Sequence, residues 1–162
     1  MVNRSALGAF GIGSLALEDF SRWGIDIERC ALLPYSINAC DNNVRADVIC
    51  KSFIGDKFAF LFLGSLYPLK GIDILLKAFA KLSPTSNWVL VLVGDDRFKN
   101  KYVHMADTLG IRDKVLFRGT LKSCIVGSVL KLANVLILPS RYKDGWGVVL
   151  NEAASMGLAL RS

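Results

Sequence analysis

The sequence contains no charge-free apolar run of about 18 residues or more, which excludes a membrane-spanning helix. With only 4 prolines and 14 glycines in 162 residues, the chain is neither collagen-like nor of low complexity. The cysteines form no C-x-x-C pair and there is 1 histidine, so no cluster has the spacing of a metal site. The chain also lacks the P-loop pattern and every zinc-finger, helix-turn-helix or RNP signature.

The chain is rich in hydrophobic residues. Hydrophobic residues make up 52% and charged residues 21%, which allows a packed core and excludes disorder, and the length suits one domain or a piece of a larger protein. The net charge of +6 is unevenly spread, because residues 1–54 carry 5 basic and 6 acidic side chains whereas residues 55–162 carry 15 and 8. An anionic partner is therefore expected at the second part. Because the chain has no signature of a nucleic-acid-binding domain, we expect this partner to be a small phosphorylated ligand and not a nucleic acid.

The distribution of the cysteines indicates the cellular compartment of the protein. They are dispersed through the chain at Cys30, Cys40, Cys50 and Cys124. Dispersed cysteines in a hydrophobic chain are typical of reduced, buried thiols, and they predict a cytoplasmic protein. The apolar stretch 6–17 is interrupted by glycines and has no A-x-A cleavage site, so we interpret it as a turn leading into a helix from Ser14 to about Trp23 rather than as a signal peptide.

Short apolar runs alternate with segments of helical spacing in the second part of the chain. The predicted strands are 58–63, 88–93, 115–117 and 135–138, and the predicted helices are 72–82, 101–109, 121–132 and 148–156. Strands that are apolar on both faces and alternate with helices form a parallel sheet covered on both sides. The predicted fold class is therefore α/β with a doubly wound parallel sheet. A fifth strand begins at 158–160, and we expect the sheet to be incomplete and the chain to be truncated.

Ligands of open parallel sheets bind beyond the carboxyl ends of the strands. The loops at those ends are 64–71, 94–96, 118–120 and 139–147, and together they predict one cleft along that edge. In the first loop Lys70 and Gly71 stand directly before a helix, where unpaired N–H groups, the helix dipole and the lysine charge suit a phosphate. The alternative is a solvated lysine next to a glycine turn.

The segment DGWGVVLNE, from Asp144 to Glu152, is the most specific motif in the chain. Glycines flank Trp146 where the fourth strand gives way to a helix, so backbone amides can face an anion or sugar hydroxyls. Glu152 lies just inside that helix, and its carboxylate suits a vicinal diol such as ribose. The alternative is a glycine-rich turn followed by an ordinary solvated glutamate.

These motifs, with FLFLGSLYPLKGIDILLKAF, LVLVGDD, VLFRGTL and ANVLILPSRYKDGWGVVLNEAASMG, resemble the C-terminal nucleotide-sugar-binding domain of family-four retaining glycosyltransferases of the GT-B fold. The resemblance extends from about Gly11 to Gly157. It implies that residues 55–162 are the donor-binding, Rossmann-like domain. Residues 1–54 are then a connector and the remnant of an N-terminal domain.

The resemblance also implies roles for the residues of the last motif. Glu152 would hold the ribose hydroxyls of the donor nucleotide. Asp144 stands next to the donor sugar where the family has a glutamate, so its carboxylate is retracted by one methylene. Gly145, Trp146 and Gly147 match the loop whose amides meet the sugar and the diphosphate.

The remaining site residues come from the other loops. Lys70, followed by Gly71, matches the phosphate-binding lysine of the family, and Ser65 stands where an arginine is usual, which removes one charge from the diphosphate site. Gly119 falls in the loop that meets the nucleobase. The implied catalytic residues are Lys70, Asp144 and Glu152.

The activity implied is transfer of a glycosyl group, with retention, from a nucleoside-diphosphate sugar, and no metal or other cofactor is expected. The acceptor, a sugar or a lipid-linked molecule, would be bound by the missing N-terminal domain. We therefore expect the chain alone to bind nucleotide but not to transfer sugar. In such enzymes a peripheral contact with the inner face of the membrane is common.

Other functions remain open at this stage. The chain could be a non-catalytic nucleotide-binding fragment or a relative of nucleotide-sugar epimerases. Asp95 and Asp96 after a strand suggest a receiver-like domain, although the fourth strand ends in Pro139–Ser140 rather than in the lysine that such a domain needs. A gene fragment unable to fold is the last alternative, because an incomplete sheet exposes an edge.

Overall fold

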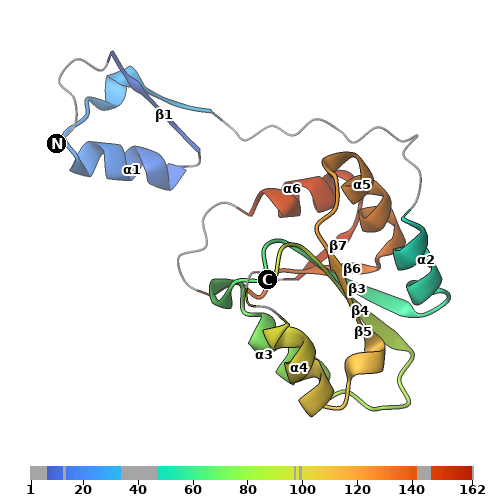
Figure 1. Ribbon diagram of the computed structural model, residues 1–162. Helices are drawn as coiled ribbons and strands as arrows, with labels where there is room; N and C mark the ends of the chain where they lie inside the picture. The colour runs from blue at the N-terminus through green and yellow to red at the C-terminus, as the bar shows by residue number, and fades with distance from the viewer. Residues whose placement is uncertain are drawn as a thin grey trace. The chain divides into compact units, whose positions relative to one another are not determined.

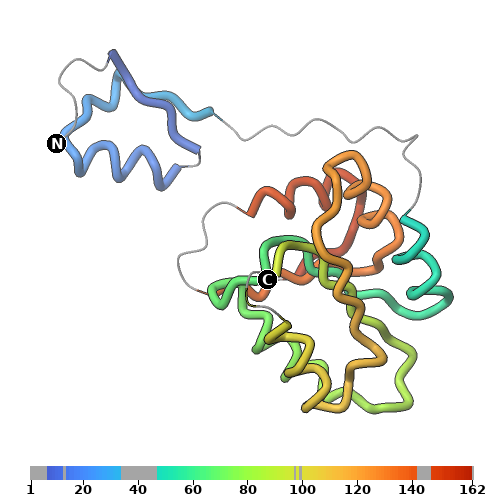
Figure 2. Tube along the Cα trace, viewed as in Figure 1, coloured from blue at the N-terminus to red at the C-terminus, as the bar shows by residue number. Residues whose placement is uncertain are grey.

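The computed structural model describes residues 7–12, 14–33, 47–96, 98, 100–141 and 147–161. The chain divides into two compact units, Met1–Asn38 and Ala39–Ser162. The candidate site residues all belong to the second unit, which is drawn in Figures 1 and 2 around a single sheet.

The second unit is built on a five-stranded sheet in which neighbouring strands are parallel. Its strands are β3 (Phe58–Leu63), β4 (Trp88–Val93), β5 (Val115–Gly119), β6 (Val135–Ile137) and β7 (Ala159–Arg161). Their order across the sheet is β5-β4-β3-β6-β7, so the chain winds outward from β3 on one side and then returns to wind outward on the other. This arrangement confirms the predicted doubly wound α/β fold, and the fifth strand begins one residue later than expected.

Helices cover both faces of this sheet (Figure 1). One face carries α3 (Ile72–Phe79) and α4 (Lys101–Thr108), and the other carries α2 (Val48–Ile54), α5 (Ser123–Leu132) and α6 (Val148–Ser155). Along β3, Leu61 and Phe62 point to opposite faces and join the two separate hydrophobic clusters. All residues of β4 are buried because β4 lies inside the sheet and both of its faces are covered.

Helix α3 shows how the apolar spacing becomes packing. Its buried residues are Ile72, Leu75, Leu76 and Phe79, which form the stripe that the sequence predicted. The helix ends at Phe79 rather than at residue 82. Leu82 is 43% exposed, so its burial favours a longer helix only weakly, and Pro84 follows soon after. Among the described residues, no helix combines the length and the apolar character needed to cross a bilayer.

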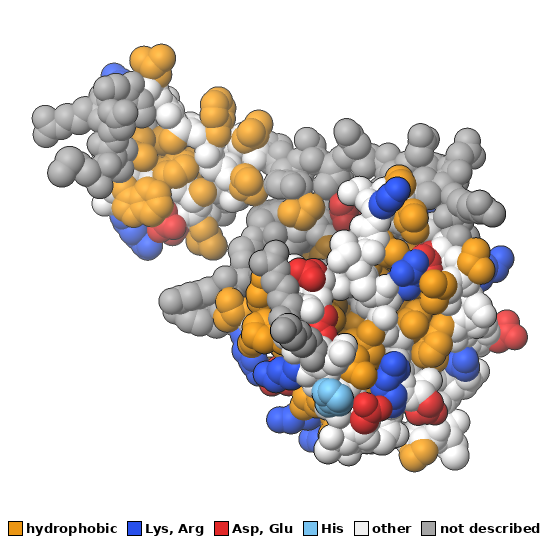
Figure 3. Space-filling view, viewed as in Figure 1, with side chains coloured by type: hydrophobic (Ala, Val, Ile, Leu, Met, Phe, Trp, Pro, Cys, Tyr) orange, Lys and Arg blue, Asp and Glu red, His pale blue; other side chains and the backbone are white. Residues whose placement is uncertain are grey.

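The first unit is small and leaves much of its apolar surface exposed. It consists of β1 (Ala9–Gly11), α1 (Ser14–Arg22), η1 (Ile27–Arg29) and β2 (Cys30–Leu32), with β1 and β2 paired in parallel. No residue of α1 is buried. Leu7, Phe10, Leu15 and Trp23 are among the exposed hydrophobic residues, and Figure 3 shows hydrophobic side chains on the visible surface of this unit.

The boundary between the units lies earlier in the chain than the predicted break after residue 54. Helix α2 packs on α5 and β5, and Asp47 before it forms an ion pair with Arg118 of β5, so this helix belongs to the second unit. The sequence did not indicate this because α2 has only 7 residues and follows a polar stretch. A helix this short has no periodicity of its own that would show which core it joins.

Candidate functional site

The direction in which the chain winds along the sheet reverses between β3 and β6. These strands lie side by side although β4 and β5 come between them in the chain. The connection after β3 leads to β4 on one side and the connection after β6 leads to β7 on the other. Such a reversal opens a crevice at the carboxyl ends of the strands, where ligands bind in folds of this class. Residues 64–71 follow β3 and residues 138–141 follow β6, so both lie at this carboxyl edge.

The loop after β3 carries Lys70 at its end. A short helix, η2 (Pro68–Lys70), is followed by Gly71, and α3 then begins. Gly71 has a φ of 68°, and a Cβ at this position would strike the backbone oxygen of Pro139, just after β6. Glycine is therefore required for the two loops to approach this closely. The close approach brings η2 and Gly71 beside residues 139–141, which follow β6.

Arg141 joins the same two loops. Its backbone N–H donates to the Leu69 oxygen at 2.7 Å, its Nη1 donates to the Pro68 oxygen at 2.6 Å, and its Nη2 donates to Asp73 Oδ2 at 2.6 Å. Burial acts to raise the pKa of Asp73, but the hydrogen bond and the charge of Arg141 hold that pKa below its ordinary value. The carboxylate is therefore ionised and paired at neutral pH.

Glu152 lies in α6, which begins after Gly147. Its side chain is partly buried, and within the described part of the chain no group gives its carboxylate a hydrogen bond or an ion pair. Burial raises the pKa of this carboxyl group. Hydroxyl donors from a ligand would stabilise the ionised form of this partly buried carboxylate.

A hollow of about 240 Å³ extends the site toward β5. Its lining is Leu66, Gly94, Asp95, Asp96, Asn100, Val103, Phe117, Gly119 and Thr120. Backbone hydrogen bonds join its walls, since the Gly64 N–H donates to the Val93 oxygen at 2.9 Å and the Gly94 N–H donates to the Gly119 oxygen at 3.1 Å. The candidate site thus continues along the carboxyl edge from β6 to β5.

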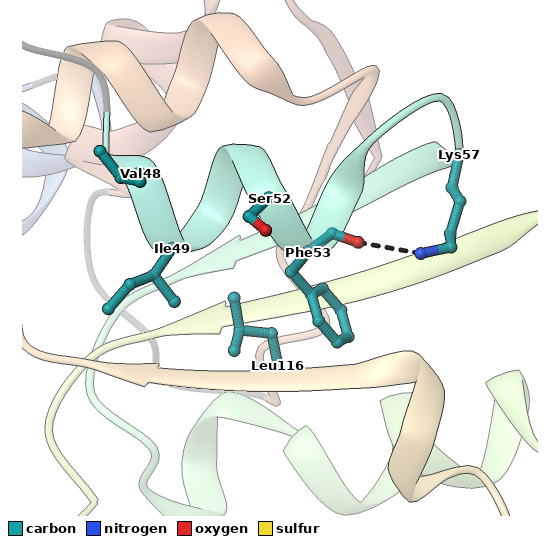
Figure 4. A pocket seen from close by; sticks show the side chains of 6 residues that line it. All are labelled: Val48, Ile49, Ser52, Phe53, Lys57 and Leu116. Carbon is teal, nitrogen blue, oxygen red and sulfur yellow. Dashed lines mark hydrogen bonds between the residues drawn. The ribbon is translucent and has the colours of Figure 1, made fainter.

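A second hollow, beside the edge strand β5, lies apart from the crevice. Figure 4 shows its lining of Val48, Ile49, Ser52, Phe53 and Lys57 from α2 and the turn after it, together with Leu116 of β5. The Lys57 ammonium donates to the Phe53 oxygen at 3.0 Å. Its walls are mostly apolar, with Ser52 and Lys57 as the polar residues of the lining, and the Lys57 ammonium is already bonded to the main chain.

The structure brings most of the predicted residues to one edge. Ser65, Lys70 and Gly71 lie in the loop after β3, and Gly119 ends β5. Gly147 is the N-cap of α6, the helix after β6, and Glu152 lies in the second turn of that helix. Asp144, Gly145 and Trp146 lie outside the described residues. His104 is exposed on α4, as expected for a surface histidine. In the part of the chain that is described, no group of three or more His, Cys, Asp or Glu side chains is arranged to hold a metal ion.

Arg141 and Asp73 were missed as members of the site. In the loop that contains Arg141, the sequence signal for a ligand site comes from the glycines and not from the arginine. Asp73 has the position of an ordinary acidic residue in the first turn of a helix. They are 68 residues apart, and no spacing in the sequence links them. Only the adjacency of β3 and β6 reveals the pair.

Comparison with known proteins agrees with this geometry. Residues 47–160 match the family model of the Glycosyl transferases group 1. An uncharacterized glycosyltransferase of Methanocaldococcus jannaschii is 32% identical over 102 residues, which are 63% of this chain and 26% of that protein.

Solved structures show the same fold. WaaG, a glycosyltransferase involved in lipopolysaccharide biosynthesis, superposes with a TM-score of 0.78 at 25% identity over 98% of this chain and 44% of that chain. Anabaena HepE in complex with UDP-glucose gives a TM-score of 0.77 at 21% identity, over 98% of this chain and 45% of that chain. The chain therefore spans less than half the length of these proteins.

Proposed function

The chain belongs to the group 1 glycosyl transferases, and from this membership we propose that its second unit binds the nucleoside-diphosphate sugar donor of a retaining transfer. The observation that carries the proposal is the position of Lys70 and Glu152 on the connections that follow two adjacent strands, β3 and β6. A cation and a carboxylate on the connections that follow these two strands suit the diphosphate and the ribose of one ligand. The structural likeness to HepE, which was solved with UDP-glucose, supports a donor of this kind.

The proposed chemistry needs positive charge where the leaving group develops negative charge. As the bond between the anomeric carbon and the diphosphate breaks, the sugar acquires oxocarbenium character and the phosphate gains charge. Lys70 and the amino-terminal N–H groups of α3 and α6 would stabilise that charge. Asp144 would stand next to the sugar, the amides of residues 145–147 would meet the sugar and the diphosphate, and Gly119 would face the nucleobase.

We propose the wider activity on the same basis. The acceptor, a sugar or a lipid-linked molecule, would be held by a part of the enzyme that this chain does not include, and the reaction would need no metal ion. The chain alone would then bind nucleotide without transferring sugar. A cytoplasmic location accords with the unpaired thiols of Cys30, Cys50 and Cys124, and a peripheral contact at the membrane belongs to the same proposal. A nucleotide-binding fragment without catalytic activity is the second candidate function.

Replacing Glu152 with glutamine should weaken nucleotide binding by about 10- to 100-fold, because two charge-assisted hydrogen bonds from the ribose would be lost. Isothermal titration of the 162-residue chain with UDP, GDP and ADP measures this effect. In the unchanged protein the affinity should also fall on acidification, from a pH higher than that at which a free glutamate is protonated, because burial raises the pKa of Glu152.

Glu28→Gln is the matched control. Glu28 is an exposed residue of η1 in the first unit, so the same substitution there should leave the nucleotide affinity unchanged. Equal affinities for Glu152→Gln and the unchanged chain would contradict the proposed role of this carboxylate. If none of the nucleotides binds the unchanged chain, the proposed function of the unit is wrong.

A further inference from the structure

We propose that Arg141 is a positioning residue that fixes Lys70 in the crevice. This inference rests on the proposed function, because it concerns how the donor-binding lysine is held. It assigns a role to a side chain whose hydrogen bonds to described residues go to Pro68 and Asp73. The role is to lock the loop after β3 onto the loop after β6.

The contacts of Arg141 bracket Lys70 along the chain. The guanidinium donates on one side to the Pro68 oxygen in η2 and on the other to the Asp73 carboxylate in the first turn of α3. The backbone N–H of Arg141 donates to the Leu69 oxygen. Three bonds from one residue therefore hold the two residues before Lys70 and Asp73, which follows Lys70 by three positions.

The planar guanidinium is suited to this task. Its fork of N–H groups reaches a carbonyl and a carboxylate at the same time, whereas an ammonium group acts as a single point. Both bonds are 2.6 Å long, which is short even for charge-assisted hydrogen bonds. The side chains of Arg141 and Asp73 are 39% and 27% exposed, so water competes only in part for this pair.

The charge of Arg141 is already balanced within the pair. Because Asp73 is ionised and bonded to the guanidinium, the two side chains together are neutral and add little net charge to the crevice. Arg141 thus acts on the nucleotide through the place it gives Lys70 rather than through its own charge.

A double-mutant cycle between Arg141 and Lys70 tests the inference. UDP, GDP and ADP affinities are measured by isothermal titration for the unchanged chain, Lys70→Ala, Arg141→Gln and the double variant. We expect each single variant to weaken binding by about 5- to 20-fold, as for loss of a charged hydrogen-bonding group. In the Arg141→Gln background, Lys70→Ala should cost less than about 2-fold more, because the two residues act as one unit.

Two further variants separate positioning from direct contact. Asp73→Asn should weaken binding much as Arg141→Gln does, because it breaks the same bridge, and Arg141→Lys should not restore it. A direct role for the arginine charge would instead let Arg141→Lys keep its affinity, and that result would overturn the inference. Arg112→Gln serves as the control, since Arg112 lies in η3 (Arg112–Lys114) at the amino end of β5 and should not affect binding.

The outcomes are distinct from those that test the proposed function. If the unchanged chain binds nucleotide while Arg141→Gln binds equally well, or if the effects of Lys70→Ala and Arg141→Gln multiply, the inference is wrong and the proposed function stands. If no nucleotide binds the unchanged chain, both are wrong. Unfolding midpoints measured alongside show that each variant is folded in the titration.

Discussion

Replacing Gly94 with alanine should destabilise the second unit by about 3 kcal/mol or more, since strained backbone alone costs about 1–3 kcal/mol per residue. Gly94 follows β4 with a φ of 151°, a conformation that L side chains rarely adopt. A Cβ there would also collide with the backbone of Gly64 and approach the Ser65 nitrogen at 3.3 Å. The atoms in the way are main chain, so the loops after β3 and β4 would have to separate. Urea denaturation followed by circular dichroism measures the loss.

Gly110→Ala is the matched control for this substitution. Gly110 also has a positive φ, 69°, but no atom lies within 4 Å of the position that a Cβ would take. Alanine at this position should destabilise the unit by only about 1 kcal/mol, which is the cost of the left-handed backbone conformation. Equal losses at the two positions would show that the contact between the loops contributes nothing. A larger loss at Gly94 would confirm that its missing side chain is what allows the loops to meet.

Replacing Asp47 with alanine should cost about 3–5 kcal/mol of unfolding free energy, as expected for breaking a buried ion pair by removing one partner. Asp47 is 6% exposed and accepts hydrogen bonds from Arg118 Nη2 at 2.7 Å and from the Cys50 N–H at 2.8 Å. Its loss would leave the Arg118 cation and the first turn of α2 without partners. Urea denaturation at neutral pH measures the change. Asp113→Ala, an exposed residue of η3, is the control.

The same carboxylate should make stability depend on pH. Hydrogen bonds from Arg118, which outweigh the opposing effect of burial, lower the pKa of Asp47 from 3.8 to about 2. Because the folded state binds this proton less tightly than the unfolded state, the stabilisation is complete above about pH 4 and is lost as the pH falls toward 2. The corresponding free energy is about 2 kcal/mol.

Denaturation curves at a series of acidic pH values check this dependence. The unchanged chain should lose stability between about pH 4 and pH 2, and Asp47→Ala should lose about 2 kcal/mol less over the same interval. If the unfolding free energies of the two proteins fell by the same amount over this interval, the pH dependence could not be assigned to Asp47. The pKa of the neighbouring Cys50 thiol is raised to about 12, chiefly by burial, so this thiol stays protonated and does not contribute to the change.

Local patterns accounted for most of the elements. The run WVLVLV predicted a strand buried on both faces, and β4 is buried throughout. The spacing from Ile72 to Phe79 predicted the buried stripe of α3. Helix ends were less predictable, as Leu82 shows, because an apolar residue extends a helix only if a neighbouring element covers it. Helix α2 was missed for the related reason that its partners, α5 and β5, come later in the chain.

The sequence by itself determined the alternation of strands and helices, the side on which the loops gather, and the positions of Lys70 and Glu152 within that alternation. These properties follow from periodicity and spacing, which record whether each residue is buried and where each strand ends. Only the tertiary structure decided that β3 pairs with β6, that Arg141 reaches Asp73, and that Asp47 meets Arg118 across 71 residues. Such contacts depend on the order of strands in the sheet, and that order is set by how whole elements pack.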